Sequence, residues 1–193
     1  MLALILILIL SYLIGSIPSG LIAGRAIWHK DLRHYGSGNI GATNAYRVLG
    51  TKGGALVFLM DFLKGELAVV LASTFCGTPS TMILAGFFAI VGHMHSIFLK
   101  MQGGKGVATS LGVITILMPK VAVIIVIVWG AIVFATRYVS LGSITAALMT
   151  PILAMAFSYH KYYVIFSIVA AAFIIIKHKD NIARIRKGRE NRF

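Results

Sequence analysis

Long apolar runs alternate with short basic connections along this chain, and no other feature restricts its fold so strongly. Of the 193 residues, 59% are hydrophobic and only 12% are charged, whereas soluble domains carry about 25% charged residues. A polar shell around a water-soluble core is therefore excluded, and lipid must be the solvent. The sequence predicts an all-α integral membrane protein that forms a single domain over residues 1–193.

We expect seven transmembrane helices, since a span needs about 20 mostly apolar residues and fewer where the bilayer thins. The first includes the run MLALILILIL, which lacks the basic region and the cleavage site of a signal peptide. Pro18 is expected to kink this helix. The predicted spans are approximately 2–23, 53–75, 80–98, 105–118, 120–135, 141–157 and 162–176.

Lys and Arg residues gather on one side of these predicted spans. Fifteen of the 18 lie in the C-terminal tail or in the connections after the first, third and fifth spans. Only Lys120 and Lys161 lie on the opposite side, and Lys64 lies within a span. Because positive charge marks cytoplasmic loops, we expect the N-terminus outside, the C-terminus in the cytoplasm and seven spans rather than six or eight. Nucleic acid is not an expected partner, since the basic residues occur in short pieces between apolar runs.

Glycines alternate with polar side chains in the first cytoplasmic connection, YGSGNIGATNAYR at 35–47. Glycine lets a backbone approach a ligand closely, successive N–H groups form an anion-binding nest, and an arginine offers a planar donor fork to phosphate. GSGNIG also matches the dinucleotide-binding pattern, but a membrane helix precedes it instead of a strand. The alternative is a flexible polar loop. The candidate ligands are Gly36, Ser37, Gly38, Asn39, Thr43, Asn44 and Arg47.

A second candidate anion site is the string GGKG, which comprises Gly103, Gly104, Lys105 and Gly106. A helix is expected to follow, and its N-terminal N–H groups and dipole attract anions. The string is not a Walker A loop, because glycine and not Ser or Thr follows the lysine. His93 and His95 lie upstream, but no carboxylate or cysteine accompanies them, so no metal site is expected.

Five further polar residues lie in or beside the predicted spans. Asp61 and Lys64 of DFLKG are three residues apart on one helix face, where they pair with each other or contact a substrate. Ser143 either points into the bundle or bonds to its own helix backbone. His178 and Asn181, also three residues apart in the tail, contact either a substrate or lipid.

These motifs resemble those of the PlsY-type bacterial glycerol-3-phosphate acyltransferases over nearly the whole chain. The shared strings are GSIPSG at 15–20, GSGNIGATN at 36–44, DFLKG at 61–65, GH at 92–93, GGKGVAT at 103–109, TRYVSLGS at 136–143 and HKDNIARI at 178–185. His95 departs from the pattern, which has an aromatic or other apolar residue there.

The resemblance implies the first step of phospholipid biosynthesis in the bacterial inner membrane. A fatty acyl group passes from acyl phosphate to the 1-hydroxyl of glycerol 3-phosphate, which gives 1-acyl-glycerol 3-phosphate (lysophosphatidate) and phosphate. Membrane lipids surround the enzyme, which is expected to be a monomer without cofactor or metal. The donor's phosphate, Asp61 or His178 takes the hydroxyl proton.

Given that reaction, our hypothesis assigns roles to the candidate residues. The catalytic set is Ser37, Arg47, Lys105 and His178. The acyl-phosphate headgroup is assigned to Ser37, Asn39 and Asn44, and glycerol 3-phosphate to Arg47, Lys105, His178 and Asn181. Ser143 contacts either substrate, while Asp61, Lys64 and His93 support the site.

Two other classes of protein share some of these features. A transporter for a phosphorylated metabolite would also have basic inner loops, but it usually carries internal repeats and polar residues at the midplane. A lipid-binding scaffold would account for the basic tail but not for the two glycine-rich motifs. The sequence therefore favours the acyltransferase.

Overall fold

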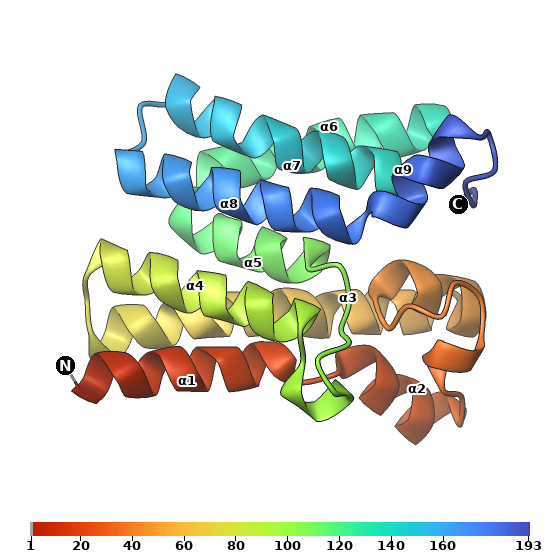
Figure 1. The fold of residues 1–193 in the computed structure, drawn as a ribbon, viewed down its shortest axis with the longest axis horizontal. Coiled ribbons are helices and arrows are strands. Elements are labelled where there is room, and N and C mark those ends of the chain that lie inside the picture. Colours follow the sequence, from red (N-terminus) through yellow and green to blue (C-terminus); the bar gives the residue numbers. More distant parts are fainter. Residues whose placement is uncertain (1) are drawn as a thin grey trace. The chain divides into compact units, whose positions relative to one another are not determined.

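The structure is a computed structural model, and it describes residues 2–193. All regular structure among these residues is helical (Figure 1). The α-helices are α1 Leu2–Ser16, α2 Ser19–Trp28, α3 Ala42–Phe75, α4 Pro79–Met94, α5 Val107–Leu117, α6 Pro119–Thr136, α7 Val139–Ala156, α8 Lys161–Lys177 and α9 Lys179–Arg186. Two short 3-10 helices are η1 Leu32–His34 and η2 Ile97–Leu99.

Three segments of the described chain are long and apolar enough to cross a membrane, namely Pro79–Leu99, Pro119–Thr136 and Val139–Ala156. Two bent pairs, α1 with α2 and α8 with α9, raise this number to five if each pair is one span. The predicted kink at Pro18 is confirmed, because α1 and α2 meet there at 41°. Seven spans and a cytoplasmic C-terminus stay predictions.

Helix α3 begins earlier than the sequence indicates. We expected a loop up to residue 52, yet the helix starts at Ala42 and runs for 34 residues. The segment ATNAYRVL has no helix breaker, so it forms helical turns. The glycines on either side of it had indicated a loop instead. Gly50, at φ 76°, interrupts the helix before its apolar part. Residues 42–49 therefore place Thr43, Asn44 and Arg47 on a rigid element instead of a flexible loop.

The described chain divides into two compact units, the first ending at Ile116 and the second comprising Leu117–Phe193. A single domain over the whole chain stays a prediction. In the first unit α1 packs along α4 (Figure 1). Small residues allow the close approach, since a Cβ at Gly15 would overlap the backbone of Ala89. The Tyr12 hydroxyl donates to the carbonyl of His95 at 2.8 Å, which ties the loop after α4 to α1.

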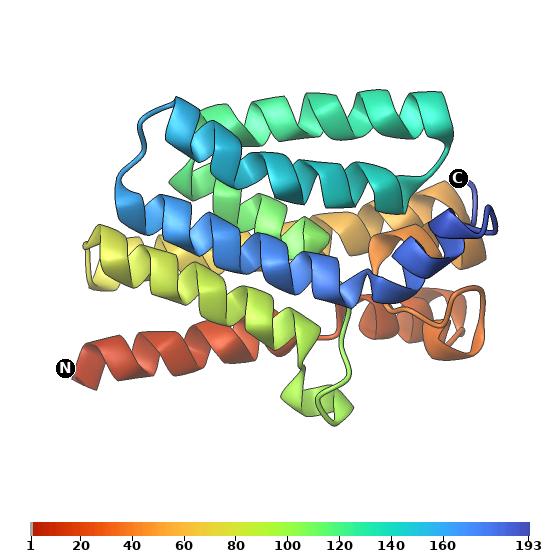
Figure 2. The ribbon, with the colours of Figure 1, turned by 45° about the horizontal axis from the view of Figure 1, so that its top comes forward.

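The second unit is built from consecutive antiparallel helices. α7 packs against both α6 and α8, and Figure 2 shows the three helices lying side by side. The helix α9 continues from α8 after a bend of 60° at His178. The chain then returns toward α7, because the N–H of Phe193 donates to the carbonyl of Arg137 at 2.8 Å.

Candidate active site

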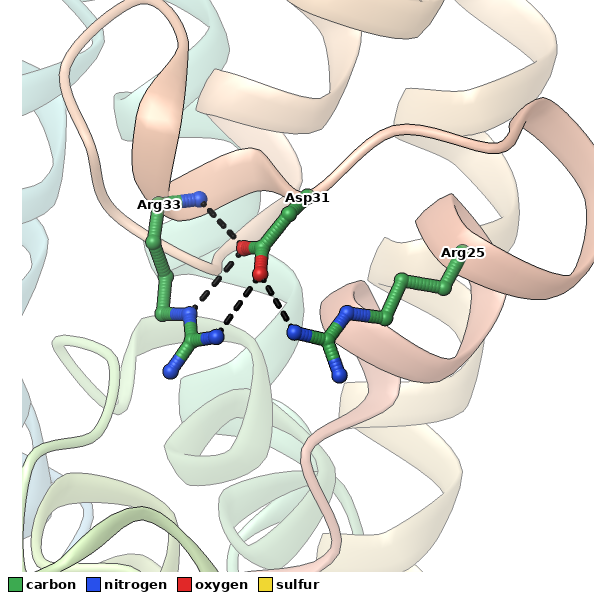
Figure 3. A network of polar contacts seen from close by, with 3 residues as sticks. All are labelled: Arg25, Asp31 and Arg33. Atoms are coloured by element: carbon green, nitrogen blue, oxygen red, sulfur yellow. Dashed lines mark hydrogen bonds and ion pairs between the residues drawn. The ribbon is translucent and has the colours of Figure 1, made fainter.

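The Asp31 carboxylate pairs with two arginines just before the first glycine-rich loop and fixes the backbone there (Figure 3). Asp31 caps η1 by accepting the N–H of Arg33 at 3.0 Å, and it pairs with Arg33 Nη2 at 2.7 Å and Arg25 Nη2 at 2.6 Å. Hydrogen bonds from the Arg33 side chain hold the pKa of Asp31 well below its usual range. Partial burial acts in the opposite direction, while the Arg33 N–H and Arg25 lower the pKa further. Leu32, fully buried, then anchors the chain in the core. The loop therefore starts from a fixed point.

Asn44 organises the loop itself. Its Nδ2 lies within hydrogen-bond distance of the carbonyls of Leu32 and Tyr35 (both 3.1 Å) and Asn39 (2.8 Å). Its Oδ1 accepts the N–H of Ser37 at 2.8 Å. With its side chain 2% exposed and committed to the backbone, Asn44 acts here as a scaffold for the loop. Its contact with a substrate stays a prediction.

The loop leads into the N-terminus of α3. Gly36 and Gly38 have φ values of 61° and 72°, which favour glycine. The residue before the helix is Gly41, and no side-chain hydrogen bond caps this end within the part of the chain that the structure describes. The first N–H groups of a helix have no intrahelical partner and carry partial positive charge. Thr43 and Arg47, four residues apart, share a helix face at this end of α3. The arrangement suits an anion such as phosphate.

The GGKG string has a similar relation to α5. The predicted helix after it is confirmed, since α5 begins at Val107. Gly106 has φ 81° and its carbonyl accepts the N–H of Ser110 at 2.7 Å. The hydroxyls of Thr109 and Ser110, both buried, have no hydrogen-bond partner among residues 2–193. Lys105, partly buried, precedes this helix and adds a cation to its positive end.

The buried charges of DFLKG pair with each other. Asp61 Oδ1 lies 2.7 Å from Lys64 Nζ and 3.5 Å from His93 Nδ1. Lys64 also donates to the carbonyl of Ile17 at 2.9 Å. Of the two alternatives that the sequence left open, the structure therefore shows the ion pair. No group of three or more His, Cys, Asp or Glu residues in the described chain could hold a metal ion.

The remaining predicted residues belong to the second unit. Ser143 Oγ donates to the carbonyl of Val139 at 2.9 Å, which is the helix-backbone alternative. His178 is buried at the bend between α8 and α9, and its carbonyl accepts the N–H of Ile182 at 2.9 Å, so only the first turn of α9 separates it from Asn181. Its Nδ1 lies 2.7 Å from the carbonyl of Ile174. Since a carbonyl only accepts, Nδ1 carries the proton and Nε2 is the nitrogen that can accept one in a neutral ring.

Glu190 is a residue that sequence reasoning missed. It is 8% exposed and accepts hydrogen bonds from Asn181 Nδ2 at 2.7 Å, Arg184 Nε at 2.8 Å and Ser140 Oγ at 3.0 Å. Burial raises the pKa of the Glu190 carboxyl. The three hydrogen bonds, of which that from Asn181 has the largest effect, lower the pKa by more than burial raises it, so the pKa is below its usual value. A single acid within the basic tail RKGRENRF was the available signal.

The family model for glycerol-3-phosphate acyltransferase matches residues 5–188. Among curated relatives, the glycerol-3-phosphate acyltransferase of Fusobacterium nucleatum is 44% identical, with 96% of each chain covered. Glycerol-3-phosphate acyltransferase 2 of Moorella thermoacetica is 46% identical and covers 97% of this chain and 96% of its own.

Two solved structures of PlsY, an integral membrane glycerol 3-phosphate acyltransferase, have the same fold. The glycerol 3-phosphate form superposes with a TM-score of 0.93 at 41% identity and covers 98% of this chain and 95% of that chain. The lysophosphatidic acid form gives a TM-score of 0.90 at 39% identity over the same shares.

Proposed function

The chain belongs to the family of PlsY-type glycerol-3-phosphate acyltransferases, integral membrane enzymes, and we propose that its acyl donor is acyl phosphate. The 1-hydroxyl oxygen of glycerol 3-phosphate attacks the carbonyl carbon of the donor. The bond between that carbon and the phosphate oxygen breaks, and its electron pair leaves with the phosphate. The products are 1-acyl-glycerol 3-phosphate (lysophosphatidate) and inorganic phosphate. Because the donor is already activated, the reaction needs no covalent enzyme intermediate, and positioning with electrostatic stabilisation supplies the catalysis.

The observation that carries this proposal is the preorganised anion site at the N-terminus of α3. We assign the donor's phosphate to this site, where Gly36 and Gly38 turn the backbone, Asn44 braces the loop by accepting the N–H of Ser37, and the first N–H groups of α3 supply the dipoles that attract the anion. The leaving phosphate gains negative charge as the bond breaks, so fixed N–H dipoles stabilise the transition state more than the ground state. Ser37 and Asn39 provide further polar contacts, and Thr43 adds its own N–H and hydroxyl.

We assign glycerol 3-phosphate to cationic and neutral donors. Arg47 and Lys105 supply charge near the positive ends of α3 and α5, within the first unit. His178 and Asn181 are assigned to the same substrate because of the family resemblance and because each is held firmly within the second unit, by Ile174 and Glu190 respectively.

The released phosphate is the most direct acceptor of the hydroxyl proton. Asp61 is a poor candidate because it is 2% exposed and already paired with Lys64. If the phosphate takes the proton, the loss of rate at low pH persists unchanged in Asp61→Asn and in His178→Gln. Complete loss of turnover in one of these variants, with substrate binding intact, would transfer the role to that residue.

The proposed location is the bacterial inner membrane, with the site on the cytoplasmic side and the protein acting as a monomer. The strong bias of Lys and Arg toward one set of connections supports this orientation. Vesicles containing the purified protein and labelled glycerol 3-phosphate test the enzyme against a transporter. An enzyme converts the label into lipid only when acyl phosphate is added. Accumulation of unmodified label inside vesicles without the donor would refute the proposal.

A further inference from the structure

Asp61, Lys64 and His93 form a buried charged cluster in the first unit, and the reaction above does not use it. Their exposed fractions are 2%, 6% and 5%. Removing charges from water costs several kcal/mol per ion, and apolar residues of the same volume often serve packing equally well. A role in packing alone therefore does not account for these residue types at these positions.

The imidazole of His93 lies against the loop that presents Lys105. A Cβ at Gly104 would overlap His93 Nε2, and one at Gly103 would overlap the His93 carbonyl. The N–H of Gly104 also donates to that carbonyl at 3.0 Å. Both glycines before Lys105 thus rest directly on His93, one on its backbone and one on its ring.

The opposite side of the ring faces the charged pair. His93 Nδ1 is 3.5 Å from Asp61 Oδ1, and Lys64 links the pair to the carbonyl of Ile17, between α1 and α2. The helix that follows the loop is tied to the same part of α3, because a Cβ at Gly65 would overlap the carbonyl of Thr109. Both ends of the loop are therefore held next to the same part of α3. The start contacts His93, which faces Asp61, and the helix after the loop packs against Gly65.

We propose that His93 is a positioning residue of the acyl transfer. Asp61 orients its imidazole, the imidazole sets the position of Gly103 and Gly104, and these fix Lys105 for its anionic substrate. Lys64 pairs with Asp61 and offsets the energetic cost of burying its charge, so an ionised carboxylate can lie beside the imidazole. The inference rests on the proposed binding of glycerol 3-phosphate by Lys105.

A paired substitution separates positioning from stability. Asp61→Leu combined with Lys64→Met removes both charges at similar volume, so the variant should accumulate and melt close to the wild type. His93 loses its orienting carboxylate, however, and the KM for glycerol 3-phosphate should rise on the order of tenfold or more, with the KM for acyl phosphate unchanged. The control is Ile90→Val, a buried change one turn earlier on α4 that alters packing but not either KM.

A second test measures the coupling between ring and loop directly. Gly104→Ala should raise the KM for glycerol 3-phosphate on the order of tenfold in the wild type, because its methyl group displaces the loop from the imidazole. In a His93→Ala background the ring is gone, and the same methyl should change the KM less than about twofold. This cycle decides the question by itself if the paired variant does not accumulate.

Equal effects of Gly104→Ala in the two backgrounds would overturn the proposal, as would an unchanged KM for glycerol 3-phosphate in a folded paired variant. Failure of the proposed function looks different. In that case the wild type itself forms no lysophosphatidate from acyl phosphate, and the variants have no activity to compare.

Discussion

Replacing Glu190 should destabilise the second unit strongly, because this one carboxylate joins the C-terminal segment to two helices. It joins α7 through Ser140, and α9 through Asn181 and Arg184. A hydrogen bond to a charged group contributes about 1.5–3 kcal/mol. In Glu190→Ala the buried amide of Asn181 loses its acceptor, whereas Arg184, whose side chain is 38% exposed, regains water. We therefore expect a loss of about 2–4 kcal/mol, from the lost hydrogen bonds and the unsatisfied buried amide of Asn181.

The assay is thermal unfolding in detergent, followed by circular dichroism. A chain of this size loses about 2–4 °C in Tm per kcal/mol, so Glu190→Ala should melt roughly 4–16 °C lower. Glu190→Gln keeps the acceptor oxygen but loses the charge facing Arg184, and about 1–2 kcal/mol is expected. Asp180→Asn is the control, since Asp180 is an exposed acid in the first turn of the same helix α9.

The pH dependence has a definite sign. The pKa of Glu190 is lower in the folded than in the unfolded protein, so the unfolded state binds more protons and the stabilisation is lost as the pH falls. The gap in Tm between wild type and Glu190→Gln should be full above the unfolded pKa of about 4.3 and close on acidification through the folded value. A Glu190→Ala variant that melts no lower than Asp180→Asn would refute this reasoning.

Three further predictions concern the first unit. Asn44→Ala removes the contacts that shape the glycine-rich loop and should lower kcat/KM on the order of 100-fold. Asn39→Ala loses the bond to the N–H of Gly41 and the proposed contact with the donor's phosphate, and it should lower kcat/KM about tenfold. Steady-state assays in detergent compare the two variants, and equal losses would contradict the organising role of Asn44. Lys105→Met should raise the KM for glycerol 3-phosphate about 10- to 100-fold through loss of a charge-assisted bond, and an unchanged KM would contradict the assignment. Arg33→Gln should make the Tm less sensitive to acid than Arg25→Gln does, because Arg33 makes more of the contacts that lower the pKa of Asp31. Melting curves at successive pH values measure this, and a Tm that is more sensitive to acid in Arg33→Gln than in Arg25→Gln would contradict the reasoning.

The sequence predicted the class of fold and its bend at Pro18, because composition and proline chemistry are local properties. It did not predict where α3 begins. Glycines and polar residues around Ala42 are typical of a loop, but the eight residues before Gly50 contain no breaker and form helical turns. The shared helix face of Asp61 and Lys64 followed from their spacing of three residues, but the choice between an ion pair and a substrate contact needed the structure.

The roles of Asn44 and Glu190 depend on tertiary structure. Asn44 was predicted as a substrate ligand, but whether its side chain meets the carbonyls of Leu32 and Tyr35 depends on how the loop folds back over α3. Glu190 lies among basic residues that resemble a solvated tail, and only the return of the chain toward α7 brings it to Ser140. The approach of His93 to Gly104 is of the same kind, because it joins residues in different elements across a tight turn.

The most direct test of the central claim is the identity of the acyl donor. Purified enzyme in detergent is given glycerol 3-phosphate with either acyl phosphate or an acyl thioester, and lysophosphatidate and inorganic phosphate are measured in the same reaction. We expect the two products in equal amounts with acyl phosphate and no lysophosphatidate with the thioester. Lysophosphatidate formed from the thioester, or phosphate released from acyl phosphate without lysophosphatidate, would contradict the account.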